Sequence, residues 1–373
     1  MEDCWICFLV KIFFPYLNKY MTQYLSDKLR ILSLISIIFV LYIHSGFHAD
    51  EIEGMVMNDR FQEFISGMMG RCAVPLFYVI SGYLFFLKVP DGMTSIYGKM
   101  KKRVRTLVVP YIIGCLFFIG FGVLMAVLPG VSKYMNSSVM PLFSKPVGEI
   151  LRSIFYDAGN GSPCAFQLWF LRDLILIVAT SPLWYLCLKH LKWGFVAVLF
   201  ILTYLDVPHV PFYPLFWFVL GGQLTKVRIE SKGNNGIRTI EFLALCLFSV
   251  LSIVELFFPD IVDWSLLRIP IILFGILGAW GVYDVIIKKD FSLSQHRWLA
   301  TACHFTFFIY LFHEPTLNIV RKLIVVIIGK NAVGYLVSYL LSPWIFIIVS
   351  IPVAAFLKRH FVSIYKVCVG YRI

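Results

Sequence analysis

LRILSLISIIFVLYIHSGF, residues 29–47, is an apolar run with Arg30 near one end and His44 near the other. An α-helix rises about 1.5 Å per residue, so this stretch is long enough to cross a hydrocarbon core of roughly 30 Å. Ionisable groups that bracket a membrane span are costly to keep, which makes them candidates for chemistry. The stretch therefore predicts a transmembrane helix with functional groups at its two ends.

Composition extends this interpretation to the whole chain. Of its 373 residues, 60% are hydrophobic and 14% are charged, and the mean hydropathy is +0.82. These values are typical of a membrane protein and exclude a water-soluble surface of ordinary composition. Only helices and closed barrels can span lipid, and the alternating strands of a barrel are absent from the sequence. We expect an all-α polytopic membrane helix bundle.

Apolar segments of sufficient length alternate along the chain with charged or Pro/Gly-rich breaks, and they predict about ten transmembrane helices. The predicted spans are residues 29–47, 72–88, 104–128, 168–188, 193–206, 212–225, 239–258, 265–287, 301–320 and 333–357. The fifth and sixth spans are short, and residues 207–211 carry two prolines between them. A bent pair that does not cross the membrane fully is the alternative there.

The positions of Lys and Arg predict the orientation. If the N-terminus is inside, most of the 33 Lys and Arg residues fall on the same side of the membrane, and cytoplasmic loops retain positive charge. We therefore expect both termini to be cytoplasmic. The net charge of +12 follows from this asymmetry and from contact with anionic headgroups of the lipid bilayer. No nucleic-acid partner is expected.

One membrane domain, residues 27–357, accounts for most of the chain, because no internal repeat is visible and the longest segment between spans is the outer loop 129–167. Residues 358–373 are expected to form a basic cytoplasmic tail. Residues 1–26 are interpreted as an interfacial segment or as an extension from an earlier start site, since Met21 stands just before the first span.

The nine cysteines form no recognisable metal or disulfide pattern. Cys4 and Cys7 have the spacing of a metal-ligand pair, but no second pair accompanies them. The other cysteines are scattered, mostly within predicted spans, and their odd total argues against a disulfide framework. We expect no bound metal and no resident cofactor.

Three polar residues share one face of the first predicted helix. Ser33 and His44 are eleven positions apart and fall within about 20° of one another, and Arg30 falls within about 40° of His44. The backbones of Arg30 and His44 are about 21 Å apart along the helix axis. One end can therefore meet a cytoplasmic group while the other faces outward. Without their neighbours, Arg30 reads as an interfacial anchor and His44 as an interfacial histidine.

Five motifs follow one another along the chain. They are KLRILSLISIIFVLYIHS (28–45), RCAVPLFYVISGYLF (71–85), RVRTLVVPY (103–111), LWFLRDL (168–174) and FFIYLFHEP (307–315). In this order they resemble the acyltransferase-3 family of bacterial membrane acyltransferases, over about residues 27–357. The family pattern has a basic residue eleven positions before the first-helix histidine. This chain has Ser33 there, with Arg30 one turn earlier.

The resemblance implies a bacterial inner-membrane enzyme that transfers an acyl group, usually acetyl from cytosolic acetyl-CoA, to a hydroxyl of a surface polysaccharide or its lipid-linked precursor. An alcohol that attacks a thioester needs a base, and histidine is the usual choice near neutral pH. His44 is the candidate. It either deprotonates the acceptor directly or first carries the acyl group itself. A homo-oligomer is left open.

A second group of candidates stands at the outer end of the ninth span. His313 and Glu314 are expected near the level of His44 and Arg71, and His313 is the second catalytic candidate. We expect Arg71 and Glu314 to pair across the bundle. The pair would either fix the register of the helices or form part of an acceptor site that orients hydroxyls or stabilises the oxyanion.

Three further residues are candidates for binding the acceptor. Arg172 and Asp173 lie near the outer end of the fourth span, and consecutive charges pair poorly on a helix, so each is expected to find a separate partner. A structural role is an equal alternative for both. Ser81 is the third candidate, although it precedes a glycine in a pattern typical of close helix packing.

The donor is expected to meet the cytoplasmic Lys/Arg cluster that opens the third span. Phosphates are held best by several convergent cations, Arg above all. Arg103 and Arg105, with Arg30 and Ser33 on the first helix, are therefore predicted to contact acyl-CoA. The positive-inside rule explains the same cluster without a ligand.

Two other classes of protein fit parts of the sequence. A transporter or glycolipid flippase would have a similar number of spans, but it would more often show repeated halves, and no repeat is visible. A sensor or scaffold without catalysis would fit if Ser33, in place of the family's basic residue, indicates that the active site has been lost. Release of free CoA from acetyl-CoA distinguishes an acyltransferase from both.

Overall fold

A computed structural model describes residues 22–47, 54–87, 89, 92–127, 146–156, 162–205, 210–226, 235–288 and 290–371. Within these ranges the regular elements are all helical, which confirms the all-α prediction. The segment that contains Cys4 and Cys7, and most of the predicted outer loop, lie outside the described residues.

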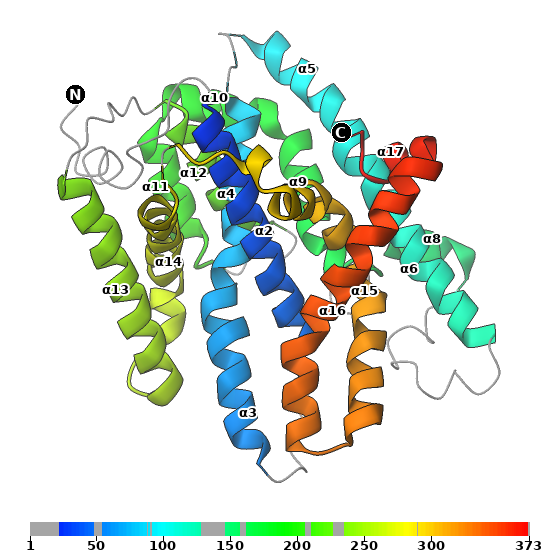
Figure 1. Cartoon of the computed structure of the whole chain (residues 1–373). Helices are drawn as coiled ribbons and strands as arrows, with labels where there is room; N and C mark the ends of the chain where they lie inside the picture. Colours follow the sequence, from blue (N-terminus) through cyan, green and yellow to red (C-terminus); the bar gives the residue numbers. More distant parts are fainter. Residues whose placement is uncertain are drawn as a thin grey trace.

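The helices follow one another without a sheet between them in these ranges (Figure 1). The longer α-helices are α2 (Gln23–Ser45), α4 (Ala73–Phe86), α5 (Met93–Arg103), α6 (Val109–Val127), α9 (Trp169–Ala179), α10 (Ser181–His190), α11 (Trp193–Leu202), α12 (Phe212–Leu224), α13 (Asn235–Phe257), α14 (Trp264–Ile286), α15 (Arg297–Ile328) and α16 (Ala332–His360). The shorter α-helices are α3 (Met55–Gln62), α8 (Val147–Ser153) and α17 (Val362–Cys368). Short π or 3₁₀ segments are η1 (Glu63–Met69), η2 (Gly70–Cys72), η3 (Val104–Val108), η5 (Phe166–Leu168) and η6 (Leu293–Gln295).

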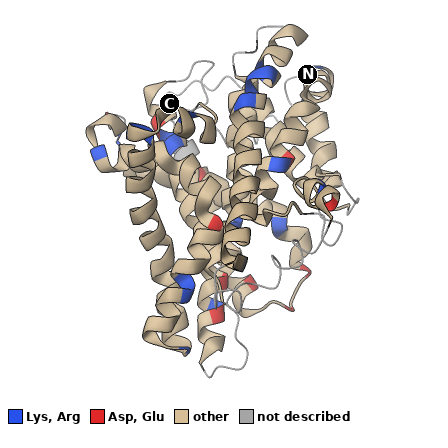
Figure 2. Cartoon of the chain, turned by 90° about the vertical axis from the view of Figure 1, so that its right-hand side faces the viewer, with Lys and Arg blue, Asp and Glu red and all other residues tan. Residues whose placement is uncertain are grey.

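Six helices in the described ranges are long and apolar enough to cross a membrane, and α9 with α10, bent by 64°, makes a seventh if it counts as one span. Figure 2 shows long stretches of these helices without a charged residue. Helices α11 and α12 are apolar but shorter than the others. At about 1.5 Å per residue they fall short of a core of roughly 30 Å. The structure therefore supports a multi-pass bundle, and the count of ten stays a prediction.

Two of the spans begin earlier than hydropathy predicts. The second runs over Met55–Phe86 rather than from residue 72, and the third runs over Met93–Met125 rather than from residue 104. In both, π-helical turns join a polar first part to an apolar second part. Hydropathy detects only the apolar part, because a helix can continue beyond the hydrocarbon core with polar side chains.

Helix α15 is broken in the middle. Glu314 has extended rather than helical torsion angles, φ −106° and ψ 137°, and Pro315 follows it. A proline lacks an N–H and disfavours the helical conformation of the residue before it. The break divides the predicted ninth span into two shorter helices.

Helices α4 and α12 approach one another closely at two glycines. A Cβ atom on Gly82 would lie 1.9 Å from the carbonyl oxygen of Phe218, and one on Gly221 would lie 2.0 Å from that of Val79. Only glycine allows this separation, as in other close helix crossings in membranes. The close packing predicted at Gly82 is confirmed, and it holds Ser81 beside the crossing.

The first turns of α2 are anchored on α14 by a buried lysine. Lys28 Nζ lies 2.7 Å from Asp284 Oδ2 and 3.7 Å from the centre of the Trp280 ring. Tyr24 donates a further hydrogen bond to Asp284. Two residues along a helix are about 200° apart around its axis. Arg30 is therefore directed away from α14, toward α4 and α15.

The two ends of the bundle differ in what they carry. The first turn of α2 lies at the same end as α5 and α17, whereas α3 and the turn between α15 and α16 lie at the opposite end (Figure 1). Helix α2 thus carries Arg30 near the α5 end and His44 toward the α3 end. Residues of the predicted tail form α17. Its Tyr365, together with Val369 directly after the helix, packs against Phe305 and Phe308.

Candidate functional site

His44 and His313 come together inside the bundle. His44 stands in the last turn of α2, and His313 directly precedes the break in α15. The centres of their rings are 4.8 Å apart. The two histidines that the motifs singled out therefore form one pair.

The hydrogen bond of His313 fixes where its ring proton lies. Nδ1 is 2.6 Å from the carbonyl oxygen of Tyr310, and a carbonyl can only accept, so Nδ1 donates. In a neutral ring this leaves a lone pair on Nε2. Nε2 is buried and has no hydrogen-bond partner among the residues that the structure describes. His313 thus offers an unused proton acceptor next to His44.

The end of α2 that carries His44 is held by Arg321, which sequence analysis did not identify. The guanidinium donates a 2.7 Å hydrogen bond to the carbonyl of His44 and a second one to that of Gly46. It also lies 4.0 Å from the centre of the Phe47 ring. Carbonyls in the last turn of a helix lack partners within the helix, and cations suit this end. Arg321 follows Glu314 by seven residues, about two helical turns. This spacing was the feature of the sequence that could have identified Arg321 as part of the site.

Arg71 does not pair with Glu314. Its Nη2 lies 2.7 Å from Glu255 Oε2 on α13, and its Nε donates to the carbonyl of Gly67. Glu314 is buried at the break of α15, where its carbonyl accepts a hydrogen bond from Gln167 Nε2 at 3.2 Å. The predicted pair was wrong because the carboxylate next to Arg71 is that of Glu255, at the end of α13. Hydropathy does not show where α13 lies in the bundle.

Arg172 and Asp173 pair with each other, which also corrects the prediction. Nε and Nη2 of Arg172 lie 2.9 and 2.8 Å from Asp173 Oδ1. The rule that consecutive residues pair poorly on a helix considers only the directions in which their side chains leave the backbone. The long arginine side chain folds back and reaches its neighbour despite those directions. Neither residue lines the cavity described below.

A cavity of about 530 Å³ lies between α2, α4, α9, α15 and the end of α5. Its apolar wall is formed by Leu29, Phe77, Ile80, Leu84, Leu107, Phe170, Leu171, Leu174, Ala300 and Phe307. Its polar lining includes Ser26, Arg30, Ser33, Ser81, Arg103, Cys303, His304, Thr306 and Tyr310. Four of the residues predicted from the motifs, Arg30, Ser33, Ser81 and Arg103, therefore meet around one space.

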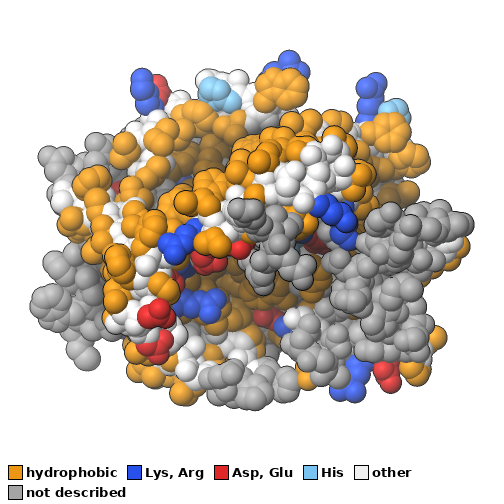
Figure 3. Space-filling model, turned by 90° about the horizontal axis from the view of Figure 1, so that it is seen from below, with side chains coloured by type: hydrophobic (Ala, Val, Ile, Leu, Met, Phe, Trp, Pro, Cys, Tyr) orange, Lys and Arg blue, Asp and Glu red, His pale blue; other side chains and the backbone are white. Residues whose placement is uncertain are grey.

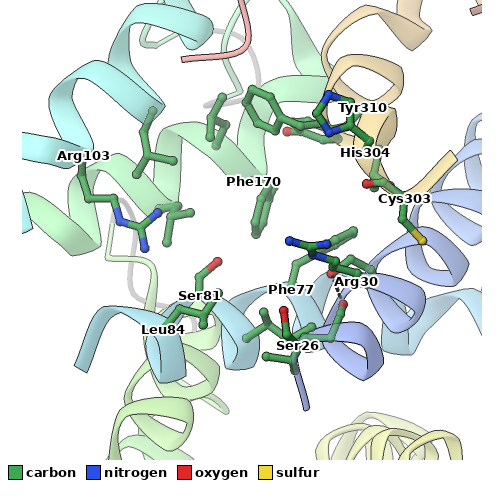
Figure 4. Close-up of a pocket in the computed structure, with 18 of the residues that line it drawn as sticks. Ser26, Arg30, Phe77, Ser81, Leu84, Arg103, Phe170, Cys303, His304 and Tyr310 are labelled. Carbon is green, nitrogen blue, oxygen red and sulfur yellow. Dashed lines mark hydrogen bonds between the residues drawn. The ribbon is translucent and has the colours of Figure 1, made fainter. Parts of the chain in front are cut away.

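Two guanidinium groups face this space from opposite sides. Figure 4 shows Arg103 and Arg30 directed toward each other, with the Ser81 hydroxyl between them. The ion pairs found between described residues involve neither arginine. Facing cations without a carboxylate are costly to bring together unless an anion joins them. The arrangement suits a phosphate or diphosphate.

Arg105 is not brought to the cavity. Its guanidinium carbon lies 3.3 Å from the centre of the Tyr371 ring, on the outside of the bundle. Such a cation–π contact stabilises a surface side chain without any ligand. Ser33 lines the cavity, and its hydroxyl donates to the carbonyl of Leu29 at 2.7 Å. Of the predicted donor-binding residues, the structure thus groups Arg30, Ser33 and Arg103 and leaves out Arg105.

An aromatic layer connects the cavity with the histidine pair. Tyr310 and Phe170 both line the cavity, and their ring centres are 5.9 Å apart. The Tyr310 ring is also 5.9 Å from that of His313, and Phe166 is 5.6 Å from His44. Neither histidine lines the cavity, so the Tyr310 ring lies between His313 and that space.

Seen from the α3 end, acidic and basic side chains gather near the middle of a largely hydrophobic face (Figure 3). This is the end toward which α2 carries His44. Among the described residues, no group of three or more His, Cys, Asp or Glu side chains is placed to hold a metal ion.

Comparison with known proteins identifies the family of the chain. The acyltransferase-3 family model, described as an acyltransferase domain, matches residues 12–359. The chain belongs to the acyltransferase-3 family. It is also similar to the succinoglycan biosynthesis protein ExoH of Rhizobium meliloti (strain 1021), with 25% identity over 313 residues that cover 78% of this chain and 77% of the relative. No solved structure matches the chain significantly. The family resemblance seen in the five motifs is thereby confirmed.

Proposed function

We propose that this acyltransferase-3 protein moves an acyl group, most simply acetyl, from cytosolic acyl-CoA to a hydroxyl of a cell-surface polysaccharide or its lipid-linked precursor. The observation that carries the proposal is the pair of His44 and His313, which lies one aromatic layer from a cavity with two guanidinium groups that join none of the ion pairs found between described residues. The similarity to a protein of succinoglycan biosynthesis supports a polysaccharide acceptor.

The donor fits the cavity in two parts. Its diphosphate lies between Arg30 and Arg103, where two cations converge. Its uncharged arm follows the apolar wall, which includes Phe77 and Leu171, toward the histidines. Because neither histidine lines the cavity, the thioester reaches them past Phe170 and Tyr310.

The proposed reaction needs one proton acceptor. The acceptor hydroxyl gives its proton to a neutral imidazole of the pair while its oxygen attacks the thioester carbonyl. The tetrahedral oxyanion then collapses, the carbon–sulfur bond breaks, and the departing thiolate takes the proton from the imidazole. The products are an ester and free CoA, and the imidazole is neutral again. His44 is our candidate for this base, with His313 Nε2 as the second acceptor in the pair.

The proposed function also predicts the orientation of the protein in the membrane. With ten spans and both termini in the cytoplasm, the α5 end and the cavity face the cytosol, where acyl-CoA is found. The α3 end then faces the outside of the bacterial inner membrane, from which the acceptor approaches. The charged groups on that face are available to polar sugars (Figure 3).

The test is release of free CoA. Purified protein in lipid nanodiscs is mixed with acetyl-CoA and candidate bacterial glycans, and both free thiol and acetylated glycan are measured. Transfer by the wild-type protein and its loss in His44→Ala are expected. Undiminished transfer by that variant would remove His44 from the mechanism, and a wild-type protein that releases no CoA with any glycan would contradict the activity itself.

A further inference from the structure

A second basic group lies at the rim of the cavity. His304 lines the cavity, and Lys358 Nζ at the end of α16 lies 2.8 Å from His304 Nε2. A lysine ammonium has donors only, so Lys358 donates and the imidazole accepts with a neutral nitrogen. In Figure 4, His304 stands on the Arg30 side of the cavity, opposite Arg103. Lys358 therefore adds a positive charge on that side.

This charge has no acidic partner in the part of the chain that the structure describes. The ion pairs found there join other residues, and the contact of Lys358 is with an imidazole rather than a carboxylate. Together with Arg30 and Arg103, it makes three cations around one cavity. Like charges in a partly desolvated space destabilise one another unless an anion binds among them. The rim therefore points to a second anionic group on the ligand.

We propose that Lys358 and His304 bind the 3′-phosphate of coenzyme A, a proposal that rests on acyl-CoA being the donor. Coenzyme A carries two separate anionic groups, a diphosphate and a phosphate monoester on its ribose. The facing arginines suit the diphosphate, and the ammonium at the rim suits the monoester, because lysine binds phosphate as a point charge. When the phosphate is bound, the ammonium donates to it, and the freed imidazole nitrogen takes a proton and donates as well.

The experiment compares two nucleotides that differ only in this group. Dissociation constants for CoA and for 3′-dephospho-CoA are measured by calorimetry on the full-length protein in nanodiscs. We expect the wild-type protein to bind CoA about tenfold more tightly, since a hydrogen bond to a charged group is worth roughly 1.5 kcal/mol or more. Lys358→Met should lower the affinity for CoA to that for 3′-dephospho-CoA and leave the latter unchanged.

Two controls separate this role from a structural one. Arg359→Gln removes a neighbouring exposed cation from the same helix and should retain the preference for CoA. Lys358→Arg should restore most of the preference that Lys358→Met loses. A loss of stability alone would weaken the binding of both nucleotides equally.

The possible outcomes distinguish the two proposals. If the wild-type protein binds neither nucleotide, acyl-CoA is not the donor and the proposed function fails with the inference. If it binds both equally, or if Lys358→Met keeps the preference, the donor assignment stands and the role of Lys358 is wrong.

Discussion

The imidazole rings of His44 and His313 lie 4.8 Å apart, although one closes the first long helix and the other precedes the break in α15. His313 already uses Nδ1 as a donor to Tyr310, so its catalytic contribution depends on Nε2. Replacement by asparagine retains a donor close to the position of Nδ1 and removes the second nitrogen.

We predict that His313→Asn folds normally and lowers kcat by about 10² to 10⁴, the range for loss of a general acid–base group. The apparent KM for acetyl-CoA should change little, because His313 does not line the cavity. Steady-state kinetics and thermal unfolding in detergent measure both effects. If kcat of the variant is normal, His313 has only a structural role.

Arg321 should matter through the position of His44. Arg321→Met removes the two hydrogen bonds to the carbonyls of His44 and Gly46, so the end of α2 loses its fixed position. A displacement of about 1 Å can cost roughly 100-fold in rate, and we expect a decrease of that order in kcat without a change in CoA affinity. Lys330→Gln, an exposed cation after the same helix, is the control. Equal losses in both variants would contradict a specific role for Arg321.

The sequence predicted which residues come together better than it predicted the partners of the charged residues. His44, His313, Arg30 and Arg103 stand in the five motifs, and the structure brings the first two together and the last two to one cavity. These predictions depend on residue type and on position within a single helix. A sequence pattern contains both.

The partners of the charged residues were not predictable in the same way. Arg71 pairs with Glu255 and Lys28 pairs with Asp284, in each case with a residue on a distant helix. One sequence does not tell which helices are neighbours in the bundle. The early starts of the second and third spans were missed because a hydropathy window ends where polar residues begin.

The two arginines of the third-span motif should differ in their effect on the donor. Arg103 faces the cavity, whereas Arg105 lies on the Tyr371 ring. We predict that Arg103→Gln raises the apparent KM for acetyl-CoA about tenfold, because a hydrogen bond to a charged group is lost. Arg105→Gln should change it by less than about twofold, since exposed contacts of this kind contribute little. Equal effects would mean that charge near the membrane surface, rather than a contact in the cavity, controls KM.

Cysteine labelling tests the orientation. Lys101 lies in α5, at the same end as the start of α2, and Met57 is exposed in α3 at the opposite end. In a background without reactive native cysteines, Met57→Cys should react with a membrane-impermeant maleimide in intact spheroplasts. Lys101→Cys should react only after permeabilisation. The reverse pattern would place the cavity outside and exclude cytosolic acyl-CoA as the donor.

Lys28 should be a determinant of stability rather than of chemistry. Its ammonium is buried against Asp284 and Trp280 and does not line the cavity. Removing one partner of a buried pair typically costs about 3–5 kcal/mol, because the other charge remains without compensation. We predict a loss of this order for Lys28→Met, measured by denaturant unfolding in detergent. Combining it with Asp284→Asn should restore much of the stability, because the amide carries no charge and still accepts from Tyr24. If the double variant is no more stable than Lys28→Met alone, the cost arises from lost packing against Trp280 instead of an uncompensated carboxylate.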